Sequence, residues 1–136
     1  VIETVEAYIE SQHTYFVLET LDTLRKNGRL TGIKAVVATA LNIKPVMGST
    51  PEGTICQLGQ ARGIKKALVK MVEQVAEDVK NSKDKILAIA HCNCRDRAEA
   101  VKNMILEKIN VKDVIILDTA GISSMYAADG GVIVVV

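Results

Sequence analysis

The sequence predicts an α/β fold of the two-layer α+β kind, in which helices pack mainly on one face of a mixed β-sheet. In the second half, helical apolar periods alternate with short apolar runs, in the order helix, strand, helix, strand, loop, strand. The composition is 49% hydrophobic but only 3% aromatic, which indicates an aliphatic core. A length of 136 residues suits one domain.

The first thirty residues predict a helix, a strand and a second helix. Residues 2–10 have apolar positions at spacings of three and four, which is typical of an amphipathic helix. Tyr15–Leu18 is a β-prone run. Leucines then recur every three residues from Leu18 to Leu24, with Thr20 as the expected N-cap. This helix should end at Asn27-Gly28, because glycine tolerates the left-handed conformation.

The next segment predicts a short buried helix followed by a β-hairpin. Ile33–Leu41 is apolar and rich in alanine, which favours the helix. Leu41–Met47 has the character of a strand, and Pro45 within it should lie at an edge or a bulge because proline lacks an N–H donor. Thr50–Gly53 has the chemistry of a turn, and Thr54–Gln60 would be the return strand.

Two longer helices and three strands complete the expected fold. Asn81–Lys85 is a polar connection, and the continuous apolar run Ile86–Ala90 suggests a strand covered on both faces. The other two expected strands are Val114–Leu117 and Val132–Val136. Each helix has apolar residues along one face: Ile64, Leu68, Val72, Val75 and Val79 in the first, and Ala98, Val101, Ile105 and Ile109 in the second.

The composition also argues against several classes of partner. A net charge of +1 gives no reason to expect nucleic acid or an anionic membrane surface. No run reaches the roughly 20 apolar residues of a membrane span, so stable membrane insertion is not expected. Three cysteines are too few for a disulfide framework, which favours a reduced, cytoplasmic setting. The chain begins without Met and inside a predicted helix, which suggests a fragment of a longer protein.

One cluster of soft ligands follows a predicted strand. His91-Cys92-Asn93-Cys94 could hold a thiophilic metal or supply a reactive thiol, whereas a plainer interpretation is a strand end with Asn93 capping the next helix. A tetrahedral site needs a fourth ligand, and only His13 and Cys56 remain, both distant in sequence. We therefore predict no metal and no cofactor.

Cations flank two predicted helices. Arg29 follows the Asn27-Gly28 turn, and Arg62 and Lys65 lie at the start of the long helix, where positive charge opposes the helix dipole. They could be ordinary solvated side chains or a docking edge for an acidic partner.

The sequence offers no recognisable catalytic constellation. Ser123 and Ser124 share a loop with Asp129-Gly130-Gly131, but they have neither a nearby His nor a Gly-x-Ser-x-Gly context. The glycine loop precedes a strand, whereas a dinucleotide-binding loop precedes a helix. The sequence thus favours a binding module for an apolar ligand over an enzyme.

Three blocks carry a resemblance to a known family. Tyr15–Leu30 contains an aromatic strand, a Leu-x-x-Leu helix and a Gly-Arg turn; Leu41–Val46 is a Leu-x-Ile-Lys-Pro block; and Arg62–Ala67 is an Arg-Gly-x-x-Lys-Ala helix start. In order and spacing they resemble the C-terminal half of DegV-family proteins, which are bacterial fatty-acid-binding proteins. The resemblance covers the whole chain.

The resemblance implies a two-domain protein that holds one long-chain fatty acid between its domains and performs no chemistry itself. Residues 1–136 would be the C-terminal lipid-binding domain, and an N-terminal domain, absent here, would supply the hydroxyls for the carboxylate. The bound acid would be presented to a dihydroxyacetone-kinase-like fatty-acid kinase, with Arg29 and Arg62 meeting that kinase and Lys65 beside them. The expected apolar lining comprises Leu30, Ile33, Val36, Val37, Leu41, Ile43, Val46, Tyr126 and Ala127.

The chain departs from the family pattern near its C-terminus. The family often has a His-Thr-Gly-Pro-Gly-type loop whose His helps to hold the carboxylate, whereas Met125–Gly131 contains no His and has Ala127 near that position. Tyr126 or Ser124 as a substitute is a hypothesis. Two rival functions stay open: a regulator or enzyme that uses His91, Cys92 and Cys94 or the Asp129 loop, and a domain whose only role is docking.

Overall fold

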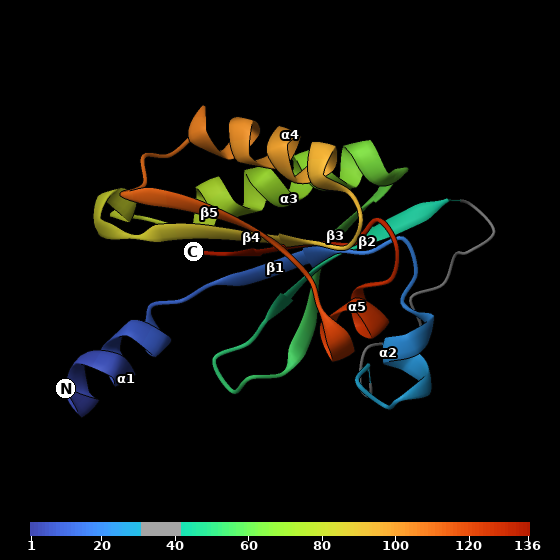
Figure 1. The fold of residues 1–136 in the computed structure, drawn as a ribbon, viewed down its shortest axis with the longest axis horizontal. Coiled ribbons are helices and arrows are strands. Elements are labelled where there is room, and N and C mark those ends of the chain that lie inside the picture. Colours follow the sequence, from blue (N-terminus) through green and yellow to red (C-terminus); the bar gives the residue numbers. More distant parts are fainter. Residues whose placement is uncertain (31–41) are drawn as a thin grey trace.

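A six-stranded mixed sheet organises the part of the chain that the computed structural model describes, residues 1–30 and 42–136 (Figure 1). The strand order is β3-β2-β1-β6-β4-β5. Strands β4 and β5 are parallel, and the other neighbours are antiparallel, which confirms the mixed sheet. The strands are β1 (Thr14–Val17), β2 (Ile43–Ser49), β3 (Ile55–Arg62), β4 (Ile86–His91), β5 (Asp113–Asp118) and β6 (Val132–Val135).

Two long helices cover one face of the sheet. α3 (Ile64–Asp78) and α4 (Arg95–Leu106) lie side by side on this face in Figure 1 and bury the main core against it. The core is aliphatic apart from Tyr15, as the composition predicts. The Tyr15 hydroxyl donates a hydrogen bond of 3.0 Å to Asp78 Oδ2, and burial raises the pKa of Tyr15 well above its usual range.

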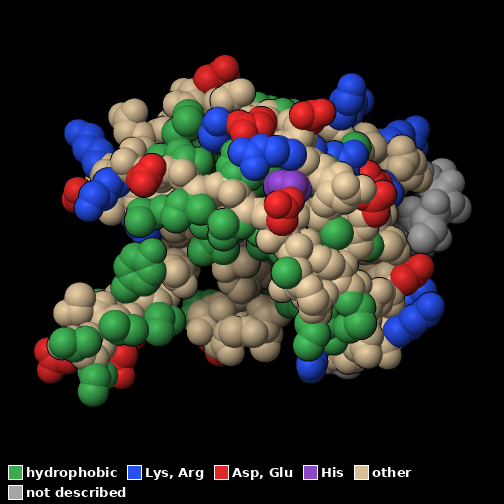
Figure 2. All heavy atoms as spheres, in the orientation of Figure 1, with side chains coloured by type: hydrophobic (Ala, Val, Ile, Leu, Met, Phe, Trp, Pro, Cys, Tyr) green, Lys and Arg blue, Asp and Glu red, His purple; other side chains and the backbone are tan. Residues whose placement is uncertain are grey.

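The opposite face carries shorter elements. α2 (Asp22–Lys26) and α5 (Gly121–Ala127) pack together at one end of it, and α1 (Ile2–Glu10) extends from the other end (Figure 1). No residue of α1 is buried, and its apolar side chains gather on the projecting helix in Figure 2. Among the described residues, none of the helices is long and apolar enough to cross a bilayer.

The predicted hairpin is present with slightly different limits. β2 and β3 pair antiparallel around the Thr50–Gly53 turn, in which Gly53 N–H donates to Thr50 O at 2.9 Å. Pro45 lies one residue before the register shift between Val46 and Met47. Because β1 pairs with β2 only at Met47 and Gly48, Pro45 can occupy an inner strand without leaving a ladder bond unmade toward β1.

Several element limits differ from the sequence prediction. α2 begins at Asp22, and Leu18 is buried outside the helix. The prediction of Thr20 as the N-cap was wrong, because Leu21 is the N-cap residue; Thr20 Oγ1 accepts a hydrogen bond from Asp22 N–H at 3.2 Å. α4 ends at Leu106, before Ile109. α5 replaces part of the loop expected before the last strand. The predicted helix Ile33–Leu41 lies outside the described residues.

Candidate functional site

A second, smaller apolar cluster lies on the sheet face opposite α3 and α4. We call it the apolar wall. Leu18, Leu24 and Ala127 are its buried members, and they bring together the end of β1, α2 and α5. Strand residues close it from the sheet side. Its partly buried members are Phe16, Leu21, Leu30, Ile55, Cys92, Tyr126 and Ile133.

The structure brings some of the predicted lining residues together and separates others. Leu30, Tyr126 and Ala127 meet in the apolar wall, although 96 positions separate Leu30 from Tyr126 in the sequence. Ile43 is half-buried at the start of β2. Val46 is 1% exposed and packs in the main core. The remaining predicted members lie outside the described residues: Ile33, Val36, Val37 and Leu41.

Several wall residues in or next to strands are not among the predicted lining. They are Phe16 of β1, Ile55 of β3, Ile133 of β6 and Cys92, which directly follows β4. Strand alternation explains the position of Ile133: Val132 and Val134 are fully buried in the main core, so Ile133 between them faces the other way. The uniformly apolar run Val132–Val136 contains no polar residue that marks this face in the sequence.

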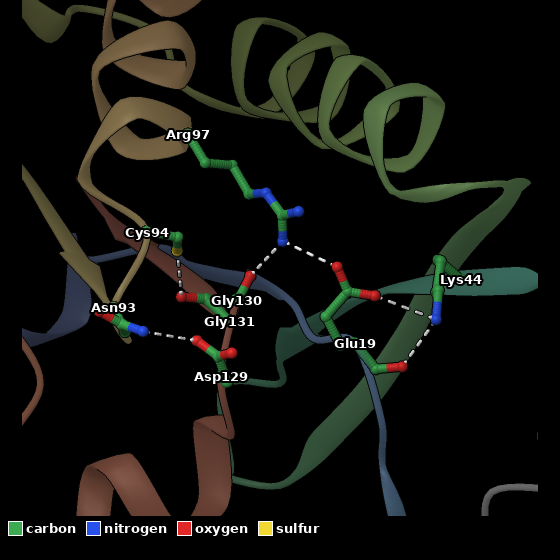
Figure 3. Close-up of polar contacts among 8 residues, drawn as sticks. All are labelled: Glu19, Lys44, Asn93, Cys94, Arg97, Asp129, Gly130 and Gly131. Atoms are coloured by element: carbon green, nitrogen blue, oxygen red, sulfur yellow. Dashed lines mark hydrogen bonds and ion pairs between the residues drawn. The ribbon is translucent and has the colours of Figure 1, made fainter.

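A polar network lies next to the apolar wall, because Glu19 follows Leu18 in the chain and Gly131 packs against Leu18 and Ala127. Figure 3 shows its contacts. Arg97 Nη1 of α4 donates to Glu19 Oε1 at 2.9 Å and to Gly130 O at 2.6 Å. Lys44 Nζ of β2 donates to Glu19 O at 2.7 Å and lies 3.2 Å from Glu19 Oε2. Glu19 thus joins two cations from opposite sides, and the network fixes the segments that carry Glu19 and Gly130 relative to α4 and β2.

The Gly130-Gly131 turn is tightly packed between this network and the wall. Gly130 has a φ of +88°, which favours glycine, and a Cβ there would lie 2.8 Å from Arg97 Nη1. A Cβ on Gly131 would lie 2.5 Å from Ala127 O and 2.9 Å from Leu18 Cδ2. The two glycines therefore allow the wall residues Leu18 and Ala127 to approach the start of β6.

The His91–Cys94 segment is held by hydrogen bonds within the fold. Cys94 N–H donates to His91 Nδ1 at 3.2 Å, so neutral His91 carries its proton on Nε2. This Nε2 lies 3.3 Å from Asp118 Oδ1, but the two atoms are not aligned for a hydrogen bond. The prediction of Asn93 as the helix cap was wrong: Cys94 is the N-cap residue, and Asn93 has a φ of +55° and donates to Asp129 Oδ1 at 3.2 Å.

The two thiols of this segment face different surroundings. Cys92 packs in the apolar wall, whereas Cys94 packs against the main core and contacts Gly131 O at 3.5 Å. Burial raises the pKa of the Cys94 thiol, which disfavours the reactive thiolate. Within the described ranges, no group of three or more His, Cys, Asp and Glu side chains is arranged to hold a metal ion.

The loop hydroxyls and the predicted docking cations have clear positions. Ser124 Oγ and Thr119 Oγ1 share a hydrogen bond of 2.8 Å that ties α5 to the end of β5, while Ser123 is exposed. Arg29 is exposed on the turn after α2, where its N–H donates to Leu24 O at 2.8 Å. Arg62 and Lys65 are exposed at the junction of β3 and α3.

Comparisons with known proteins agree on one family. The family model described as "Uncharacterised protein, DegV family" matches residues 1–136. A DegV domain-containing protein of Clostridium perfringens is 30% identical over 119 residues, covering 85% of this chain and 41% of that protein. Another from Streptococcus pneumoniae is 32% identical over 133 residues, covering 98% and 47%. The chain spans less than half the length of these relatives.

Solved structures with the same fold include proteins described with bound fatty acids. A DegV-family protein of Ruminococcus gnavus, described with vaccenic acid, is 68% identical with a TM-score of 0.96, over 99% of this chain and 48% of that one. A Eubacterium eligens protein loaded with heptadecanoic acid is 28% identical with a TM-score of 0.84, over 98% and 48%. The Streptococcus pneumoniae Fatty Acid Kinase (Fak) B3 protein loaded with linoleic acid is 30% identical with a TM-score of 0.85, over 98% and 47%.

Proposed function

Because the chain belongs to the DegV family, we propose that its protein binds one long-chain fatty acid and that residues 1–136 form the C-terminal lipid-binding domain of that protein. The observation that carries the proposal is the match, at 68% identity, to the Ruminococcus gnavus protein described with vaccenic acid. The apolar wall supports it, since apolar side chains from six segments of the chain meet there beside the polar network of Glu19, Lys44 and Arg97.

Burial of an acyl chain supplies enough free energy for tight binding. Each methylene contributes about 0.8 kcal/mol on leaving water, so a 16-carbon chain contributes roughly 10 kcal/mol before the costs of ordering. Such an interaction needs apolar surface and few polar contacts. The apolar wall offers this combination, with the carboxylate placed at the polar network beside it or on a further domain.

Native mass spectrometry of the full-length protein tests this binding function. We expect one added mass per protein that matches a long-chain fatty acid, and release of the free acid after denaturation. Incubation of stripped protein with oleic acid should restore the added mass. Protein that stays free of acyl ligand in both preparations would contradict the proposal.

The protein further acts as a carrier subunit that presents the fatty-acid carboxylate to a fatty-acid kinase, without catalysing a reaction itself. The similarity to the Fatty Acid Kinase (Fak) B3 protein supports this role. Arg29, Arg62 and Lys65 are exposed cations suited to an acidic docking surface on the kinase.

Charge reversal separates docking from lipid binding. The double variant Arg29→Glu, Arg62→Glu should lower kinase-dependent acyl-phosphate formation by about tenfold or more, because rim charges control encounter, while its acyl content stays unchanged. Arg95→Glu is a matched control, since Arg95 is exposed on α4 beside Glu99. Unchanged turnover in the double variant would contradict the docking assignment.

A further inference from the structure

A strained turn joins α5 to β6 next to the apolar wall. Ala128, the C-cap residue of α5, has a φ of +56° and a ψ of 169°, a conformation that is essentially restricted to glycine. Gly130 follows with a φ of +88°. Backbone strain of this kind persists only where the surrounding structure holds it, and it is common at ligand-binding sites. Contacts from outside the turn must therefore keep it in place.

The β4–α4 segment supplies these contacts. Gly130 N–H donates a hydrogen bond to Cys92 O at 2.8 Å. Two side chains also hold the turn (Figure 3): Asn93 Nδ2 donates to Asp129 Oδ1 at 3.2 Å, and Arg97 Nη1 donates to Gly130 O at 2.6 Å. Substitution of Asn93 or Arg97 can therefore remove a contact to the turn without changing the turn's own sequence.

Arg97 also holds the segment that carries Leu18. The same Nη1 donates to Glu19 Oε1 at 2.9 Å, while Lys44 Nζ donates to Glu19 O at 2.7 Å. Leu18 directly precedes Glu19, and Ala127 directly precedes the strained turn; both are buried members of the apolar wall. One side chain of α4, on the opposite face of the sheet, thus ties together the two segments that supply them.

We infer that Arg97 is a positioning residue for ligand binding, an inference that rests on the proposed fatty-acid binding. Arg97 lies outside the apolar wall and acts through Glu19 and Gly130. By holding these two residues, it keeps the wall in the shape that retains the bound acid. Without Arg97, the strain at Ala128 favours a relaxed turn, the end of α5 moves relative to β6, and the acid leaves faster.

The rate of fatty-acid release from the full-length protein tests this inference. The fluorescent fatty acid cis-parinaric acid is bound and then displaced by excess oleic acid, and stopped-flow fluorescence gives the dissociation rate constant. Arg97→Gln should raise this constant about tenfold, the scale of one lost hydrogen bond to a charged group. Asn93→Gly removes the second side-chain contact, tolerates the φ of +55° at that position, and should raise the constant about threefold.

A second substitution in the turn separates positioning from general stabilisation. Glycine adopts the backbone conformation of Ala128 without strain, so Ala128→Gly should keep the turn in place when the Arg97 contact is lost. The double variant Arg97→Gln, Ala128→Gly should therefore release the acid within about twofold of the wild-type rate, a non-additive result that shows coupling between the two positions.

Two further variants control for effects that do not involve the turn. Tyr15→Phe removes the hydrogen bond to Asp78 in the main core, which lowers stability, but it should release the acid at the wild-type rate. Arg95→Gln removes an exposed ion pair with Glu99 on the same helix as Arg97 and should also leave the rate unchanged. Circular dichroism establishes that each variant is folded.

The possible outcomes are distinguishable. If the wild type binds cis-parinaric acid and Arg97→Gln releases it no faster than Arg95→Gln does, the inference is wrong and the proposed function stands. Equal acceleration by Tyr15→Phe, or a double variant as fast as Arg97→Gln alone, would also overturn the inference. If the wild type binds neither cis-parinaric acid nor oleic acid, the proposed function fails, and the inference fails with it.

Discussion

Replacing Gly131 by alanine should displace the turn that closes the apolar wall. The new Cβ would lie 2.5 Å from Ala127 O, 3.1 Å from Ala127 C and 2.9 Å from Leu18 Cδ2. Two of these atoms are backbone, so a side-chain rotation cannot remove the conflict. The start of β6 or the end of α5 must shift instead.

The size of the effect follows from the packing around Gly131. Extra methyl groups in well-packed interiors cost about 1–3 kcal/mol, and the backbone contact places Gly131→Ala toward the upper end. The melting temperature should fall by roughly 3–10 °C. Because Leu18 and Ala127 belong to the apolar wall, the bound acyl content should fall as well.

A matched glycine separates the clash from a general effect of glycine replacement. A Cβ on Gly59 would meet only the far end of the Lys70 side chain, with Cε at 2.9 Å, and that chain can move. Gly59→Ala should therefore be neutral or stabilising by about 0.5 kcal/mol, as expected for alanine in a strand. Urea unfolding measures both variants. A Gly131→Ala protein as stable as Gly59→Ala would refute the reasoning.

Three further predictions concern partly buried polar contacts. Tyr15→Phe should lower the free energy of unfolding by about 1 kcal/mol, measured by urea unfolding, because it removes the hydrogen bond to Asp78. The pKa of Tyr15 is raised in the folded protein, so the stability of the wild type should also fall as pH rises above about 10. The stability of Tyr15→Phe should lack this pH-dependent loss. Arg97→Gln should lower the free energy of unfolding by about 1–2 kcal/mol, because it breaks the ion pair with Glu19. Arg95→Gln breaks only an exposed ion pair with Glu99 and should lower it by less than about 0.5 kcal/mol. Equal effects would contradict the role of the Glu19 network. His91→Leu should cost about 1–3 kcal/mol because Cys94 N–H loses its acceptor, and a neutral effect would contradict that contact.

The sequence predicted the main elements because their patterns are strong. The long apolar face of α3 and the turn at Thr50–Gly53 each contain enough consistent residues to identify the element. α5 was missed for a physical reason: it has seven residues, only Ala127 is buried, and Ile122 is 72% exposed, so no apolar stripe marks it.

The candidate site was only partly predictable. Leu30, Tyr126 and Ala127 were proposed from the family resemblance, and the structure brings them together. Phe16 and Cys92 reach the same cluster through strand order, because β1 and β4 are separated in the sheet by β6 alone. Local periodicity gives the side of each strand but not which strands become neighbours, so these members required the structure.

Photo-crosslinking tests most directly whether the apolar wall holds the acyl chain. Full-length protein is irradiated with a fatty acid that carries a mid-chain diazirine, and peptide mass spectrometry locates the label. We expect labelling of residues on the wall face, such as Phe16, Cys92 and Ile133, with competition by unlabelled oleic acid. Label confined to the outer surfaces of α3 and α4, or insensitive to oleic acid, would contradict the account.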